Sequence, residues 1–288
     1  MSTSTTPPPA RRVPRRVRWA WLLVLLGGVA GYLIVLRTLV ATQNPLYVPS
    51  LLLLGSAVVP ASVLVYAASG PRRAQVGAGL IAAVAGIGGV IGTVAAGTLE
   101  YDTLQRLGAV PMIMVGLIEE SAKLVVPLII LLFARRRDPA AGVIIGVASG
   151  MGFATLETMG YGFSALLQSR SLADLDQTLL LRGLLSPAGH VAWTGVATAA
   201  LWRIPSAARK ARAVGLFVAT FAAAVALHAL WDGSELWLVR TVVGVVSFAG
   251  LLIVVHRSRR AADREQEPPT WTYGPYVPPP GAVDPATP

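Results

Sequence analysis

The sequence predicts an all-α protein, a polytopic bundle of about eight transmembrane helices with both termini in the cytoplasm. Composition is the first reason: 54% of the 288 residues are hydrophobic and 13% are charged, against about 25% charged in an ordinary soluble domain. Eight apolar runs are each long enough to cross roughly 30 Å of hydrocarbon. Arginine collects in alternate connections between these runs, and that distribution predicts the orientation of the bundle.

The eight runs define one membrane domain, which we expect to cover residues 19–256. Residues 1–18 are rich in Ser, Thr, Pro and Arg, and they predict a disordered basic lead in the cytoplasm. Residues 257–288 end in YVPPPGAVDPATP, and they predict a disordered Pro-rich cytoplasmic tail. The expected spans are 19–39, 46–68, 74–98, 108–133, 139–167, 184–204, 211–233 and 236–256, with loops between them.

The positive charges are distributed as the positive-inside rule requires of a cell-membrane protein. With a cytoplasmic N-terminus, 18 of the 24 Lys and Arg residues fall in inside segments and five fall outside. The inside clusters are expected to contact anionic lipid headgroups. The net charge of +10 therefore indicates a membrane surface as the partner, and not nucleic acid.

Ionisable side chains inside the apolar runs are costly to bury, so each is a candidate functional group. At about 1.5 Å per residue, the glutamates lie roughly 15–18 Å from the outer face and the histidines about 8–9 Å from it. These depths predict one active site in the outer half of the bilayer. The groups occupy four consecutive expected spans: Glu119, Glu120, Lys123, Glu157, His190, His228 and Asp232.

The spacing of these residues suggests their chemistry. Lys123 follows Glu119 by four residues and Glu120 by three, so its amine can neutralise a carboxylate of the same helix. Asp232 follows His228 by four, so it can accept a hydrogen bond from one ring nitrogen and leave the other for a metal. Two histidines with glutamates, in a chain without cysteine, suit a zinc site that keeps a position open for water. Such a metal lowers the pKa of bound water towards 7, and a spare carboxylate can then act as general base.

Three motifs and one further histidine together resemble a known family. The motifs are EESAK at 119–123, FATLE at 153–157 and HALWD at 228–232, and His190 lies between the last two. Their order and spacing are similar to those of the PrsW-type intramembrane proteases, distant relatives of the CAAX prenyl endopeptidases. Lys123 and Glu157 favour the PrsW branch, because the CAAX branch typically carries Arg one residue later and His in the second motif. The resemblance covers about residues 108–233.

The resemblance implies an intramembrane metallo-endopeptidase that cleaves single-span or membrane-anchored protein substrates, with anti-sigma factors the best-known class. Glutamate, with or without a metal such as Zn²⁺, would activate the attacking water, and either adjacent glutamate could be the base. The roles that follow are catalytic for Glu119, Glu120 and Lys123, metal-binding for Glu157, His190 and His228, and ligand-orienting for Asp232.

Two other interpretations use the same residues. Buried carboxylates and histidines also mark proton relays, so a proton- or cation-coupled transporter is the alternative function. An ion-paired network that only holds helices together is the third interpretation. Both predict that no peptide product is formed.

Overall fold

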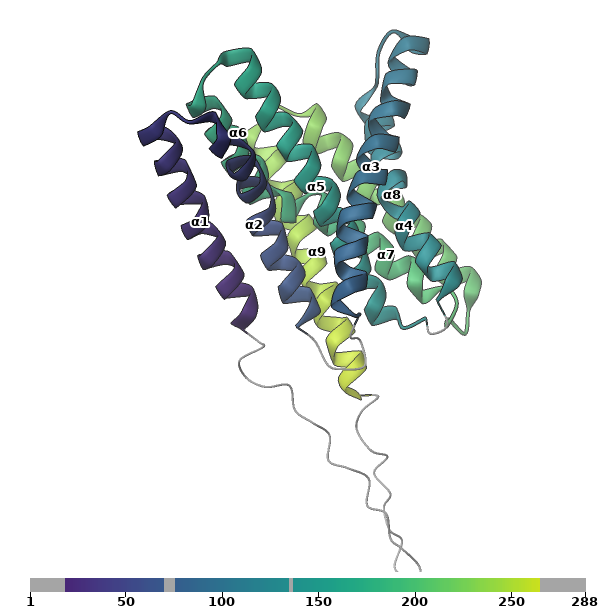
Figure 1. Ribbon diagram of the computed structural model, residues 1–288. Helices are drawn as coiled ribbons and strands as arrows, with labels where there is room; N and C mark the ends of the chain where they lie inside the picture. Colours follow the sequence, from purple (N-terminus) through teal and green to yellow (C-terminus); the bar gives the residue numbers. More distant parts are fainter. Residues whose placement is uncertain (1–18, 70–75, 135–136, 265–288) are drawn as a thin grey trace, which may run out of the picture.

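The structure is a computed structural model that describes residues 19–69, 76–134 and 137–264. Its regular elements in these ranges are all helical, which confirms the all-α prediction (Figure 1). The expected lead (1–18) and residues 265–288 of the expected tail lie outside the described residues. The α-helices are α1 (Ala20–Thr42), α2 (Val48–Ala68), α3 (Ala78–Leu107), α4 (Met112–Phe133), α5 (Pro139–Ser169), α6 (Leu172–Leu185), α7 (His190–Arg203), α8 (Lys210–Gly233) and α9 (Trp237–Arg264); two 3₁₀ turns are η2 (Pro45–Tyr47) and η4 (Ser186–Ala188).

Six of the described helices are long and apolar enough to cross a membrane, namely α1, α2 with η2, α3, α5, α8 and α9. The protein is therefore a multi-pass membrane protein with six candidate spans. Helix α4 has 22 residues, but Glu119, Glu120 and Lys123 charge its middle. Helix α7 has only 14 residues, which rise about 21 Å, less than the roughly 30 Å of a hydrocarbon core.

The expectation of one continuous span over 184–204 is wrong. The chain instead ends α6 at Leu185, makes the turn η4 and starts α7 at His190. Pro187 has no backbone N–H to donate, and Gly189 adopts φ −117° and ψ −114°, which is not helical. His190 therefore lies in the first turn of a helix and not six residues inside one.

Helix α6 occupies residues that were expected to form an outside loop. It begins where the Ser171 hydroxyl accepts a hydrogen bond from the Asp174 amide at 3.2 Å, an N-cap arrangement that stabilises a helix start. It packs against the first hairpin, where the Tyr32 hydroxyl of α1 donates to Asp176. At the other end of the chain, α9 continues to Arg264, eight residues past the expected boundary at 256.

Helix α5 forms the centre of the bundle, and 78% of its most apolar window is buried. Two glycines on it let neighbouring helices approach closely. A Cβ atom at Gly150 would come within 2.6 Å of the His190 carbonyl oxygen on α7, and one at Gly152 would clash with the Ala85 carbonyl of α3. Small residues at such crossings allow backbone-to-backbone packing in membrane helices. This packing fixes where the start of α7 lies relative to α5.

The ends of the helical bundle are arranged in a simple order. Figure 1 shows the start of α1 and the end of α9 at the same end of the bundle. The turns between α1 and α2 and between α5 and α6 lie at the opposite end. Nine of the arginines used to predict orientation lie outside the described residues: Arg11, Arg12, Arg15, Arg16, Arg18, Arg72, Arg73, Arg135 and Arg136.

Candidate active site

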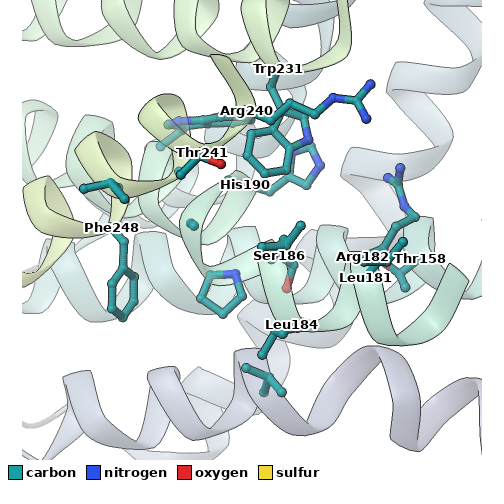
Figure 2. Close-up of a pocket in the computed structure, with 18 of the residues that line it drawn as sticks. Thr158, Leu181, Arg182, Leu184, Ser186, His190, Trp231, Arg240, Thr241 and Phe248 are labelled. Carbon is teal, nitrogen blue, oxygen red and sulfur yellow. The ribbon is translucent and has the colours of Figure 1, made fainter. Parts of the chain in front are cut away.

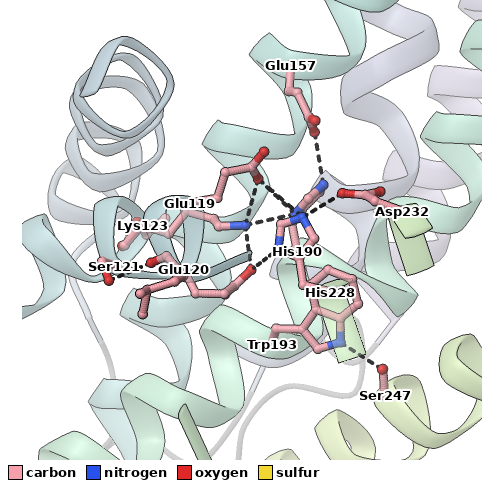
Figure 3. Close-up of polar contacts among 12 residues, drawn as sticks. Glu119, Glu120, Ser121, Lys123, Glu157, His190, Trp193, His228, Asp232 and Ser247 are labelled. Carbon is pink, nitrogen blue, oxygen red and sulfur yellow. Dashed lines mark hydrogen bonds and ion pairs between the residues drawn. The ribbon is translucent and has the colours of Figure 1, made fainter. Parts of the chain in front are cut away.

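Polar side chains of α4, α5, α7 and α8 meet in one buried cluster (Figure 3). Glu120 is 1% exposed, and Lys123 and His228 are 0% exposed. The structure brings together all seven of the ionisable residues that the sequence singled out, because each lies within 4.0 Å of another member. The contacts of each residue differ, and they distinguish residues, such as Glu119 and Glu120, whose roles the sequence alone left open.

The Lys123 ammonium lies at the middle of the cluster. Its Nζ atom is 2.6 Å from Glu120 Oε1, 3.4 Å from Glu119 Oε2 and 2.8 Å from His190 Nδ1. It also lies 4.4 Å from the centre of the Phe153 ring, which closes one side of the cluster. The helical spacing therefore brings Lys123 to both glutamates as expected, with Glu120 the nearer. A buried amine in this position is stabilised only by such close partners.

The two ring nitrogens of His228 lie near different glutamates. Nδ1 is 2.9 Å from Glu120 Oε1, whereas Nε2 is 3.6 Å from Glu119 Oε2 and 3.0 Å from Asp232 Oδ2. Nε2 is nevertheless buried without a hydrogen bond of acceptable geometry. A hydrogen bond from Nδ1 to Glu120 would leave a lone pair on Nε2, directed away from Glu120.

His190 is held by the carboxylate of α5. Its Nε2 atom is 2.9 Å from Glu157 Oε2, and Glu157 Oε1 is 2.8 Å from Arg182 Nη2 on α6. The Arg182 guanidinium in turn lies 3.8 Å from the centre of the Tyr161 ring. Two helices, α5 and α6, thus position one imidazole of α7 through a chain of charged contacts.

Three side chains could together hold a metal ion. Glu119, His190 and His228 each offer one ligand atom, and these atoms lie within 4.8 Å of one another. Glu157 was expected as a ligand, but it lies outside this group and contacts the ring of His190 instead. The carboxylate in this group is that of Glu119.

The charges and donor atoms of the cluster fit a divalent metal. With neutral imidazoles, the seven residues of the cluster together with Arg182 carry a net charge of −2, which a divalent cation would balance. The unpartnered Nε2 of His228 supplies a buried nitrogen donor, and imidazole nitrogen with carboxylate oxygen is a ligand set that zinc accepts. The four carboxylates are Glu119, Glu120, Glu157 and Asp232, and the two cations are Lys123 and Arg182.

Comparison with known protein families agrees with this geometry. The model of the PrsW family intramembrane metalloproteases matches residues 70–255, which include every member of the cluster. The chain belongs to the PrsW family. No curated protein and no solved structure gives a significant match.

Membership of the PrsW family has direct consequences. It implies that the protein is a peptidase and that it acts on membrane proteins. The match begins before α3 and ends within α9, so it is wider than the 108–233 of the sequence resemblance. The family match also favours the protease over the transporter interpretation.

Several further groups near the cluster were not predicted from the sequence. Arg182 was assigned to an outside loop, and Trp193 had no visible partner, although its ring stacks on His228 at 4.8 Å. The indole of Trp193 donates to Ser247 Oγ of α9 at 2.8 Å, so α9 also supports the site. Glu100 of α3 has a buried Oε1 that has no hydrogen-bond partner among the described residues. Its position in a long apolar helix was the available signal.

Proposed function

We propose that the protein hydrolyses peptide bonds of membrane-bound proteins at a centre formed by Glu119, His190 and His228. The observation that carries this proposal is the convergence of these three groups, from three separate helices, within 4.8 Å. A purely structural ion pair would need only two partners, whereas this arrangement aims carboxylate and imidazole atoms at one point. Family membership supplies the reaction class.

These three residues would hold a divalent metal, with zinc the ion that the donor set favours. When bound, such an ion polarises a peptide carbonyl and lowers the pKa of a water molecule. The neighbouring carboxylates keep the ligands in place. Glu120 fixes the ring of His228 from its Nδ1 side, and Glu157 fixes the ring of His190. Partners of this kind set the tautomer and orientation of a ligating histidine.

The contacts also divide the proton chemistry among the carboxylates. Glu120 is bound by Lys123 at 2.6 Å and by His228 at 2.9 Å, and Glu157 is bound by Arg182. Neither is free to exchange a proton without breaking a buried ion pair. Asp232 has a side chain that is 33% exposed and lies 3.0 Å from His228 Nε2. We therefore assign to Asp232 the transfer of a proton from the attacking water to the leaving amine.

We place this centre in the outer half of a bilayer crossed eight times, with both termini in the cytoplasm. The distribution of arginine supports this orientation, as do the start of α1 and the end of α9, which lie at the same end of the bundle in Figure 1. The two crossings beyond the six candidate spans would be α4 and the broken segment α6–η4–α7. Because the chain has no cysteine, single cysteines at Gln43 and Arg257 would report the two sides through labelling by an impermeant maleimide. Equal labelling of both positions would refute the orientation.

The substrate would be a single-span or membrane-anchored protein, with anti-sigma factors one such class. The basic segments expected on the cytoplasmic side would bind anionic lipid. Neither assignment is needed for the chemistry of the site.

Purified protein tests the function directly. Wild type, Glu119→Gln, His228→Gln and the matched control Glu235→Gln, which changes an exposed carboxylate, are compared for bound metal and for cleavage of single-span reporters in liposomes. We expect wild type and Glu235→Gln to retain metal and cleave, whereas the other two lose both while keeping their helical circular dichroism. Reporters that stay intact with metal-loaded wild type, together with proton flux into the liposomes, would overturn the proposal in favour of a transporter.

A further inference from the structure

A cavity of about 870 Å³ adjoins the cluster described above. His190 and Asp232 line it, so it reaches the reacting centre. Its lining comes from α2, α5, α6, α7, α8 and α9 and from the turn η4. Figure 2 shows His190, Trp231 and Arg240 towards one side of the view, with Leu184 and Phe248 away from them. Its volume lies within the range of about 300–1,000 Å³ typical of ligand pockets.

The lining of this cavity is apolar and aromatic apart from a few charged groups. Trp193, Trp231 and Trp237 contribute aromatic surface. Arg182 lines the cavity too, but its charge is already paired with Glu157 at 2.8 Å. Arg240 is the cation that remains without an acidic partner among the described residues, and its Nε atom is buried without a hydrogen bond.

The position of Arg240 relates it to the site. It lies three residues after the start of α9, and His228 lies five residues before the end of α8. Only residues 234–236 separate the two helices. At about 1.5 Å per residue, both side chains are therefore within about two turns of the same end of the bundle. A ligand group held by Arg240 would lie close to, but separate from, the group at His190 and Asp232.

We propose that this cavity receives a peptide segment of the substrate and that Arg240 binds an acidic side chain near the bond to be cleaved. This inference rests on the proposed function and names a specificity determinant for it. A partly buried guanidinium without a counter-charge is stabilised when it binds an anion, and its planar fork matches a carboxylate in a bidentate pair. The aromatic and aliphatic walls suit the apolar residues that flank such a side chain in a membrane protein.

Binding can be measured apart from catalysis. The probes are acetyl-Leu-Leu-Asp-Leu-Leu-amide and its Asn analogue, titrated against the inactive Glu119→Gln protein in a neutral detergent by calorimetry. We expect the Asp peptide to bind about tenfold tighter or more. This preference should disappear when Arg240→Gln is added and persist when Arg106→Gln, at an exposed position of α3, is added instead.

Two further probes identify the source of the carboxylate. If the Asn peptide with a free C-terminus binds as tightly as the Asp amide, Arg240 selects chain ends and the inference is overturned. If only phosphatidylglycerol in mixed micelles binds in an Arg240-dependent way, the site is for a lipid headgroup and the inference is again overturned.

Cleavage of single-span reporters gives the second test. We expect Arg240→Glu to raise KM for a reporter with Asp near the scissile bond by about tenfold or more, with little change in kcat, and a Lys reporter to recover the loss. Equal KM for Asp and Asn reporters with wild type would overturn the inference and leave the protease intact. Failure of every reporter, with Arg240-dependent binding of the Asp peptide retained, would count against the protease and not against the carboxylate site.

Discussion

His228 Nδ1 lies 2.9 Å from Glu120 Oε1, and this contact separates two glutamates that are adjacent in the sequence. Glu120 is 1% exposed and also forms an ion pair with the ammonium of Lys123. Glu119, one residue earlier, faces the opposite nitrogen of the same imidazole. Neighbouring side chains on a helix point about 100° apart. Glu120 therefore contacts one nitrogen of the His228 ring, and Glu119 lies near the other.

Replacing Glu120 by Gln should destabilise the protein and also weaken metal binding. The change keeps the shape of the side chain but leaves the buried Lys123 without its closest counter-charge, a loss of about 3–5 kcal/mol. Thermal unfolding in detergent, followed by circular dichroism, measures the first effect, and metal content after dialysis measures the second. Glu235→Gln serves as the exposed control. Unchanged unfolding of Glu120→Gln would refute the buried pair.

Replacing Lys123 by Met should raise the affinity for Zn²⁺ while lowering the stability of the metal-free protein. The ammonium lies 2.8 Å from His190 Nδ1 and 3.4 Å from Glu119 Oε2, so it repels a cation held by those residues. Removing a charge at such a distance should tighten zinc binding by about tenfold or more. Competition with a chromophoric chelator measures this affinity. A weaker affinity would indicate that Lys123 helps to hold the ligands.

Replacing Ser247 by Ala should loosen the support that α9 gives to the site. The Trp193 indole, which stacks on His228, would lose its acceptor at 2.8 Å and leave a buried N–H unsatisfied, at a cost of about 1–3 kcal/mol. Trp193→Phe removes that N–H, so adding Ser247→Ala in the Phe background should cost little further stability. Thermal unfolding of the four proteins forms a double-mutant cycle. Additive effects would show that the two groups do not interact.

Replacing Gly152 by Ala should separate α5 from α3, whereas the same change at Gly160 should be tolerated. A Cβ at Gly152 would overlap the Ala85 carbonyl, and one at Gly160 meets no atom within 4 Å. Overpacking of this kind costs about 1–3 kcal/mol, while Ala in an open helical position gains up to about 1 kcal/mol. The midpoint of thermal unfolding distinguishes the two variants. Equal midpoints would contradict the close helix contact.

The sequence contained much of the site because the cost of burying charge is visible without a structure. Glu119, Glu120 and Lys123 were marked by their depth in one apolar run, and helical spacing predicted that the amine would reach both carboxylates. Glu157, His190 and His228 were marked in the same way. What spacing could not supply was the distance between helices, which is set by side-chain packing. That packing brings Glu119, and not Glu157, into one group with His190 and His228.

The fold differs from expectation at two places where the hydropathy of the sequence outweighed the signals for helix ends and helix starts. The apolar run over 184–204 predicted one span, but Pro187 and Gly189 interrupt it. Ser171 with Asp174 is the pattern of a helix start, and it lay in a stretch too polar to count as a membrane helix. The sequence therefore predicts a loop at Arg182, whereas in the structure this residue lies on α6 and contacts Glu157 of α5.

The interruption at Gly189 also changes the local field. Within a continuous helix, the amide hydrogens of residues 190–192 would be bonded to carbonyl groups of the preceding turn. Because α7 starts at His190, the positive pole of its peptide dipoles terminates inside the protein, beside a concentration of acidic side chains. The helix start at this point therefore makes the interior less hostile to anions, including those that arise as an amide bond is broken.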